Sequence, residues 1–282
     1  MKAKNYYQLL TTSVLWGSSF ILIKFSLKEL DPYQIAFFRT FIGMLFINLL
    51  YKNKVKFSFK SHLRLTIIGI IWMTLPFYFF AKAEETIDAS LAGLINGSTP
   101  IFVSLIAVIF FKQRISNLQK IYLFTGFIGI YLVSFGYTIL NFEINVGTML
   151  SITASICYAI ALNIIQPLLG EYASMDVLKV ALRYGAFFSF LLFIFNSNFV
   201  FPKLPSTLLS ILILGIGSSG VAFMTFYKLI NDVGTIIGSI TVYIIPVFAS
   251  IFGFIFFQEV TSLVQIFGIL VIVYSAFKFS RT

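Results

Sequence analysis

The sequence predicts an all-α integral membrane protein with ten transmembrane helices arranged as a 5+5 inverted-topology repeat. Three observations carry this prediction: the composition, ten apolar runs of helix length, and the similarity of the two halves. Of the 282 residues, 59% are hydrophobic and only 11% are charged, with a mean hydropathy of +0.97. A soluble domain would carry about 25% charged residues. The composition therefore leaves no room for a sizeable water-soluble domain.

Ten unbroken apolar runs follow one another along the chain. A transmembrane helix needs roughly 20 apolar residues, and no run shows the alternation at period two that a β-barrel requires. The first run is too long for the core of a signal peptide and contains Trp16 and Lys24, so we expect it to be the first span. The expected spans cover residues 6–27, 33–51, 63–82, 87–111, 119–138, 146–167, 178–196, 207–229, 233–257 and 262–279.

The positions of the 20 Lys and Arg residues predict the orientation, because basic loops stay on the cytoplasmic side. With the N-terminus inside, three of them lie outside (Lys28, Lys82, Lys203) and three lie in or beside spans (Lys24, Arg39, Arg183). The other 14 lie inside: Lys2, Lys4, Lys52, Lys54, Lys56, Lys60, Arg64, Lys112, Arg114, Lys120, Lys179, Lys228, Lys278 and Arg281. We expect a multi-pass protein of the cell (inner) membrane with both termini in the cytoplasm.

The two halves of the chain resemble each other. Shifting residues 77–119 by 146 positions onto 223–265 gives eleven identities in 43 positions, among them Pro100 on Pro246. The others are Phe77/Phe223, Phe80/Phe226, Lys82/Lys228, Phe102/Phe248, Ser104/Ser250, Ile109/Ile255, Phe110/Phe256, Phe111/Phe257, Ser116/Ser262 and Gln119/Gln265. With small gaps, Arg39 also aligns with Arg183. Five spans per half, residues 1–141 and 142–282, require opposite topologies, as in many transporters.

Several short motifs in this order resemble the EamA-type carriers of the drug/metabolite transporter superfamily. They are Trp16-Gly17-Ser18-Ser19-Phe20 with Lys24, then Pro32 and Arg39, the Pro100 segment ending at Phe110-Phe111, Gln119, and in the second half Pro246, Phe257-Gln258-Glu259 and Gln265 with Gly268. The resemblance covers essentially the whole chain. The sequence departs from the family at Lys112-Gln113-Arg114, where an acidic residue is common, while Glu259 keeps the acid in the second half.

The resemblance implies a ten-helix carrier of small organic solutes, usually directed outward. It also implies a cavity lined mainly by spans one, three, four, six, eight and nine. Aromatic side chains on these spans offer an apolar face with a polar edge and can hold a cation over the ring. The candidate substrate-binding residues are Trp16, Ser19, Tyr78, Asn96, Thr99, Tyr158, Phe223 and Tyr243.

Two matched prolines predict helix kinks within the membrane. Pro100 and Pro246 each free the carbonyl four residues earlier, on Asn96 and Val242. The kinks could be packing features with Ser and Thr bonding locally. Their matched positions also favour a role in lining the cavity and in gating.

Three basic residues lie at membrane depth, where a charge is rare unless it is paired or hydrated. Lys24 and Arg39 could extend to the outer interface or pair with Glu29 and Asp31, and Arg183 could reach the inner interface or pair with Asp176. Alternatively, these bases contact an anionic substrate or act as a gate. All ten acidic residues lie at or near predicted helix ends, which argues against a dedicated carboxylate proton relay. A coupling group near an interface, such as Glu84, Glu85 or Glu259, stays open.

Enzyme chemistry has little support. The one histidine, His62, lies in a basic loop, so neither a His-based metal site nor a Ser-His-Asp triad is expected. Gly215-x-Gly217-x-x-Gly220 matches a dinucleotide fingerprint by letter but lies in an apolar span without a preceding strand. We expect no cofactor and no metal. The net charge of +10 reflects topology rather than nucleic-acid binding.

These observations predict a secondary transporter that exports amino acids or related small amphipathic metabolites by alternating access. An uptake carrier or exchanger for a nucleotide-like or anionic metabolite is the alternative within transport, and a membrane enzyme or scaffold is the alternative of another class. The expected partners are a small-molecule substrate and the lipid bilayer, with no nucleic acid. A coupling proton or an exchanged substrate, and a monomer or homodimer, are left open.

Overall fold

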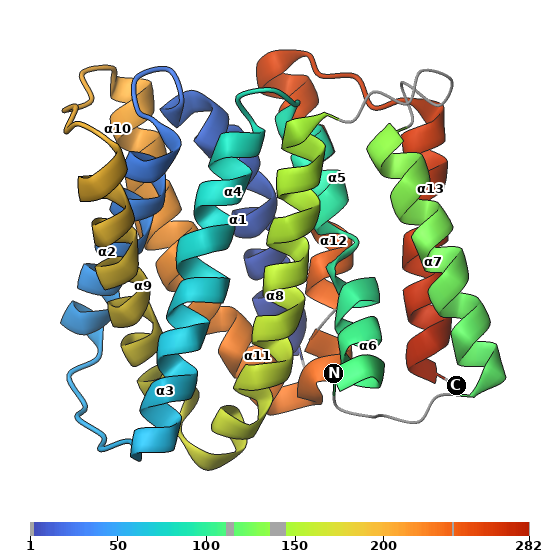
Figure 1. Cartoon of the computed structure of the whole chain (residues 1–282), viewed down its shortest axis with the longest axis horizontal. Helices are drawn as coiled ribbons and strands as arrows, with labels where there is room; N and C mark the ends of the chain where they lie inside the picture. The colour runs from blue at the N-terminus through green and yellow to red at the C-terminus, as the bar shows by residue number, and fades with distance from the viewer. Residues whose placement is uncertain (1–2, 111–115, 136–144, 239, 282) are drawn as a thin grey trace.

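The computed structural model describes residues 3–110, 116–135, 145–238 and 240–281, and this part of the chain is a bundle of helices (Figure 1). Among these residues, seven helical segments are long and apolar enough to cross a bilayer, and Thr241–Phe257 and Leu263–Ser275 are shorter apolar helices. The predicted all-α membrane fold is confirmed. Within the described residues, each of the ten predicted spans overlaps one helix or a run of consecutive helices.

The first half forms five helical segments. Their elements are α1 (Ala3–Ser26), α2 (Pro32–Leu50), α3 (Phe59–Ile68), the π-helical η1 (Gly69–Thr74), α4 (Leu75–Ala83), α5 (Ala89–Asn96), α6 (Thr99–Phe110) and α7 (Asn117–Phe135). Asp31 begins α2 as its N-cap by accepting a 3.0 Å hydrogen bond from the Gln34 amide, with Pro32 in the first turn. The third predicted span is one run, α3–η1–α4, and the fourth is broken at Gly97 and Ser98.

The second half repeats this order. Its elements are α8 (Val146–Glu171), α9 (Ser174–Asn196), α10 (Pro205–Leu212), the π-helical η2 (Ile213–Val221), α11 (Ala222–Gly238), α12 (Ile240–Phe257) and α13 (Leu263–Arg281). The loop expected between residues 229 and 233 is wrong, because α11 continues through it to Gly238. The end of the fifth predicted span and Lys112-Gln113-Arg114 lie outside the described residues.

Two π-helical segments occupy matched places in the halves. A shift of 146 residues moves Gly69–Thr74 onto 215–220, inside η2. The two π-helical segments have different sequence features. Pro76, which has no amide hydrogen to donate, lies two residues after η1, whereas η2 contains three glycines. π-helical turns inside α-helices are rare and frequently mark functional sites.

The main helix contacts have the same pattern in both halves. α1 packs on α11 and α12, and α8 packs on α4, α5 and α6; α2 packs on η2, and α9 packs on η1. The remaining large contacts join counterparts, namely α2 with α9, α5 with α12, and α7 with α13. In Figure 1, α7 and α13 form one end of the bundle and both termini lie at the lower edge. The centre of the molecule therefore consists of α1, α4, α5, α8, α11 and α12, in which the first helix of each half packs on helices of the other half.

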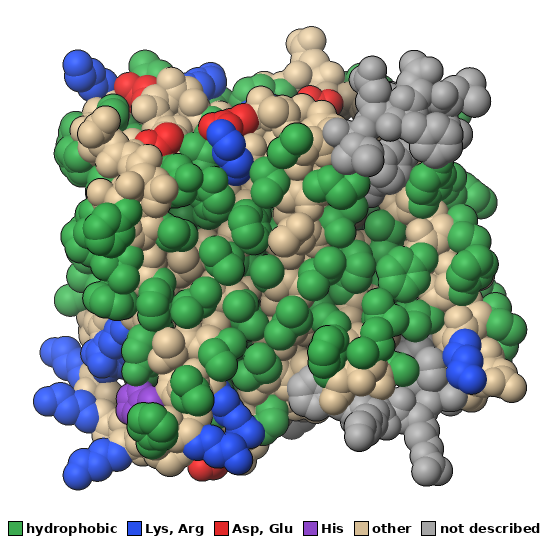
Figure 2. All heavy atoms as spheres, in the orientation of Figure 1, with side chains coloured by type: hydrophobic (Ala, Val, Ile, Leu, Met, Phe, Trp, Pro, Cys, Tyr) green, Lys and Arg blue, Asp and Glu red, His purple; other side chains and the backbone are tan. Residues whose placement is uncertain are grey.

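The surface is apolar around its middle. Hydrophobic side chains cover the central band of the face in Figure 2, whereas Lys and Arg gather mainly at the lower edge and most Asp and Glu lie at the upper edge. Large exposed side chains also occur in the middle of helices, such as Phe41 in α2 and Phe187 in α9. An apolar band between polar edges is the surface that a bilayer requires.

Candidate functional site

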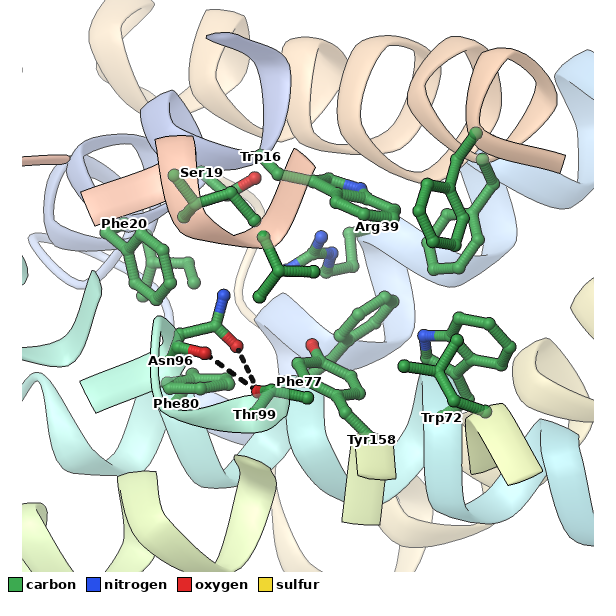
Figure 3. A pocket seen from close by; sticks show the side chains of 16 residues that line it. Trp16, Ser19, Phe20, Arg39, Trp72, Phe77, Phe80, Asn96, Thr99 and Tyr158 are labelled. Atoms are coloured by element: carbon green, nitrogen blue, oxygen red, sulfur yellow. Dashed lines mark hydrogen bonds between the residues drawn. The ribbon is translucent and has the colours of Figure 1, made fainter. Parts of the chain in front are cut away.

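A cavity lies in the centre of the bundle, between helices of both halves (Figure 3). The space inside it that the centres of water molecules can occupy is about 60 Å³. The first half contributes Trp16, Ser19, Phe20, Ile23, Arg39, Trp72, Phe77, Phe80, Asn96 and Thr99, and the second half contributes Tyr158, Leu162, Phe223, Phe226, Val242 and Ile245. One water needs roughly 10–15 Å³ by this measure. The cavity therefore accommodates a few waters, and a larger solute requires the walls to move.

Aromatic rings form much of the wall. Trp16 lies 5.2 Å from Phe223 and 4.8 Å from Phe226 between ring centroids, and Trp72 lies 5.6 Å from Phe223 on the other side. The Trp16 indole donates a 3.1 Å hydrogen bond to the carbonyl oxygen of Ser218 in η2, which fixes its orientation. Both tryptophans of the chain line the cavity. Such rings can enclose the apolar part of a solute.

Arg39 provides the positive charge of the cavity. Its side chain is only 4% exposed, Nε donates a 3.2 Å hydrogen bond to Ser219 Oγ, and the guanidinium carbon lies 3.5 Å from the centre of the Phe77 ring. Within the described part of the chain, no carboxylate forms an ion pair with Arg39. A guanidinium presents five donors, so most of its capacity stays available to an anionic group.

Asn96, Thr99 and Ser19 are the small polar residues of the lining. Thr99 Oγ1 donates a 2.7 Å hydrogen bond to the Asn96 carbonyl oxygen, the group that Pro100 leaves without its helical donor. In Figure 3 the Asn96 amide nitrogen points away from Thr99. Ser19 donates to the Leu15 carbonyl oxygen at 3.0 Å. The lining thus has few small polar groups, and the hydroxyls of Thr99 and Ser19 donate to backbone carbonyls of their own helical segments.

Tyr158 lines the cavity from α8, the counterpart of α1. Its ring centroid lies 5.9 Å from that of Phe80, and its hydroxyl points toward the side of the cavity that holds Arg39 in Figure 3. Trp16 on α1 and Tyr158 on α8 therefore line the same cavity, one from each half.

Four predicted site residues do not line this cavity. Tyr78 stacks on Tyr33, with ring centroids 4.5 Å apart and a 3.1 Å hydrogen bond between the hydroxyls, and Tyr243 packs in the core beside Val242. Arg183 is exposed and donates to Asn48 Oδ1 at 2.6 and 3.1 Å. The Lys24 ammonium donates to the carbonyl oxygens of Glu84 and Ile87, both at 3.0 Å.

Neither proline lines the cavity, although each directly follows a lining residue, Thr99 or Ile245. Pro100 is in the first turn of α6, after the break at Gly97 and Ser98, whereas Pro246 lies inside α12. A Cβ atom on Gly97 would lie 2.4 Å from Pro246 Cγ, so the break in one half touches the proline of the other. The matched prolines therefore have different local structures at one helix crossing. Their roles in lining and gating stay predictions.

Sequence reasoning missed several lining residues, mainly Trp72, Phe77, Phe80 and Phe226. The sequence similarity of the two halves could have indicated three of them. Phe77/Phe223 and Phe80/Phe226 are identities between the halves, and all four of these side chains line the cavity. No group of three or more metal-ligating His, Cys, Asp or Glu side chains occurs among the residues that the structure describes.

The family model of the EamA-like transporter family matches residues 4–135 and again residues 145–281. The chain belongs to the EamA-like transporter family. It is therefore a multi-pass membrane transporter of small molecules in the drug/metabolite transporter superfamily.

Relatives of this EamA-like transporter extend over nearly the same length. An uncharacterized transporter of Archaeoglobus fulgidus is 26% identical and covers 95% of this chain and 97% of its own. The uncharacterized transporter YoaV of Bacillus subtilis is 23% identical, with 97% of each chain covered. A solved crystal structure shares the fold, with a TM-score of 0.71, 17% identity, and 99% of this chain and 96% of that chain covered.

Proposed function

We propose that this transporter is a secondary carrier that exports amino acids or related small amphipathic metabolites by alternating access. The observation that supports it is the central cavity, which both halves line with aromatic walls, a few polar groups and one guanidinium. A solute with an apolar body and a charged or polar head fits such a lining.

Alternating access requires two halves that can exchange their contacts around a fixed site. The matched helix contacts, the double match to the family model and the two π-helical segments support two inverted repeats, residues 1–141 and 142–282. The narrow cavity also supports a cycle in which the aromatic walls separate to admit the solute.

We further propose that the protein lies in the cell (inner) membrane with both termini in the cytoplasm. The termini share the lower edge of the bundle in Figure 1, and most of the visible Lys and Arg side chains lie at that edge in Figure 2. Basic residues are retained on the cytoplasmic side of a membrane.

Arg39 favours a second candidate, a carrier for an anionic metabolite. Its guanidinium is buried in the lining with only a serine hydroxyl and a phenyl ring as partners among the described residues. A carboxylate or phosphate that binds there would form two charge-assisted hydrogen bonds. Amino acids share this carboxylate, so the two candidates differ in whether an ammonium group is also recognised.

Counterflow in liposomes tests both candidates. Purified protein is reconstituted into vesicles loaded with an unlabelled amino acid mixture, and accumulation of each labelled amino acid is followed against empty vesicles. We expect accumulation of at least one amino acid with an apolar side chain. A parallel set of vesicles is loaded with unlabelled carboxylates that lack an amino group. Accumulation only of the labelled forms of these carboxylates, in this set alone, would support the second candidate, and chemical conversion of the solutes would contradict both.

A further inference from the structure

Glu84 is a buried carboxylic acid at the end of the cavity wall. It follows α4 directly, one turn beyond the lining residue Phe80, and lies in the turn that joins α4 to α5. Its side chain is 1% exposed, and neither carboxyl oxygen has a hydrogen-bond partner in the described part of the chain. From the sequence it was expected at an interface, because it lies at a helix end.

The nearest opposite charge does not neutralise this carboxyl group. Lys24 on α1 directs its ammonium to the backbone oxygens of Glu84 and Ile87, not to the Glu84 side chain. Glu259, which follows α12, uses both of its oxygens to accept the amides of Ala89 and Ser90 at the start of α5, at 3.0 and 2.7 Å. Lys24 and Glu259 therefore direct their charged groups to backbone atoms, and neither forms a hydrogen bond with the Glu84 carboxyl group.

Charged and titratable groups surround Glu84 from several elements. Lys24 on α1 and Arg39 on α2 favour its ionised form, and Glu259 opposes it. Asp88, in the same turn, lies near Lys24 and Glu259, and Tyr158 on α8 lies near Arg39. Burial outweighs the two bases and raises the pKa of Glu84 well above its ordinary value.

We propose that Glu84 is a proton-binding site of the transport cycle, placed where the cavity meets the outer end of α4. The proposal rests on the proposed carrier function. The carboxylate takes up one proton when the walls close around it, and the carboxylic acid releases that proton when water reaches the α4–α5 turn. An unpartnered buried carboxyl group favours the neutral form, and hydration favours the ionised form.

The charge of Arg39 links this proton site to the cavity. An anionic group bound to Arg39 cancels part of the positive field that favours ionised Glu84, so it promotes protonation. By linkage, protonation of Glu84 strengthens binding of the anion by the same factor. The carrier would then move an anionic solute and a proton in the same direction, and export would be driven by the outward gradient of the solute.

The two cavity tryptophans give a direct readout, because Trp16 and Trp72 are the two tryptophans of the chain. Tryptophan emission of the purified protein is titrated between about pH 5 and 9, a range above the ordinary glutamate pKa of about 4.3. His62→Gln is the background, because histidine titrates in the same range. Glu84→Gln keeps the shape of the protonated acid, and Glu84→Asp keeps a titrating group. Glu85→Gln and Asp88→Asn are the matched neighbours.

We expect one emission transition in the background protein and in the Glu85→Gln and Asp88→Asn variants. Glu84→Asp should shift its midpoint, and Glu84→Gln should remove it. A transition that persists in Glu84→Gln, or no transition in the background protein, overturns the proposal. The titration needs no solute, so a Glu84 transition without counterflow would reject the carrier function and leave the proton site standing.

A pH gradient across the liposomes tests the coupling. For any solute that shows counterflow, the gradient should change accumulation in the background protein and leave Glu84→Gln unaffected. Equal responses of the two proteins overturn the coupling.

Discussion

The regions around Arg39 and Arg183 are aligned in the sequence but differ in chemistry. Both bases lie on the second helix of their half, and both helices cross a π-helical segment of the other half. Arg39 is buried in the cavity lining against Ser219 and Phe77, whereas Arg183 is exposed and bonded to Asn48. The two helix crossings have matching contacts, whereas the charged side chain of the cavity lining comes from the first half.

The largest expected difference is between substitutions of these two bases. Arg39→Gln removes the cationic group of the lining, and Arg39→Lys keeps the charge but loses the planar pair of donors. For an anionic solute or an amino acid, Arg39→Lys should weaken apparent affinity by about 1 to 3 kcal/mol in counterflow, and Arg39→Gln by more. Arg183→Lys and Arg183→Gln should transport normally. Equal effects at the two positions would contradict a cavity whose charge comes from Arg39 and not from Arg183.

The matching contacts predict equal sensitivity at the two helix crossings. A Cβ atom on Gly43 of α2 would lie 2.9 Å from Ser219 Cβ, and one on Gly185 of α9 would lie 2.8 Å from Met73 Cβ. Gly43→Val and Gly185→Val should each destabilise the protein by about 1 to 3 kcal/mol, measured as a lower melting temperature in detergent. Gly170→Ala is the control, because no atom lies within 4 Å of its added Cβ. Tolerance at only one crossing would show that the two crossings also differ in their packing.

The smallest expected effect is at Ser219. Ser219→Ala removes the acceptor for Arg39 Nε and leaves the guanidinium in place. A hydrogen bond to a charged group contributes about 1.5 to 3 kcal/mol when its partner stays buried, and water or solute in the cavity can replace part of this. We expect a loss of apparent affinity smaller than that of Arg39→Lys. A larger loss would show that Ser219 contacts the solute itself.

The fold could be predicted well because bilayer thickness imposes long apolar runs, and these runs are visible in the order of the residues alone. The interruptions were harder to predict. The break at Gly97 and the two π-helical segments depend on which carbonyls find donors from neighbouring helices, as with the bond from Trp16 Nε1 on α1 to the Ser218 carbonyl oxygen in η2 at 3.1 Å.

The site was predicted in part. Trp16, Ser19, Arg39, Asn96, Thr99, Tyr158 and Phe223 line the cavity, whereas Tyr78, Tyr243, Lys24 and Arg183 do not. The span that carries a residue could be deduced from the sequence, but the side of the helix that faces the cavity depends on packing. Tyr78, for example, is adjacent to the lining residue Phe77 yet stacks on Tyr33. Substrate contacts of all these residues stay predictions.

Cysteine accessibility at Ser19 tests the central claim most directly. Cys157 is the one cysteine of the chain, so a Cys157→Ala background allows Ser19→Cys to be labelled alone by a charged thiol reagent. The account predicts labelling from each side of the membrane when that side alone receives the reagent, slowed in both cases by a solute that shows counterflow. Phe187→Cys, an exposed apolar position in the middle of α9, should stay unlabelled. Labelling of Ser19→Cys from one side only, or no protection by the solute, would contradict a central cavity with alternating access.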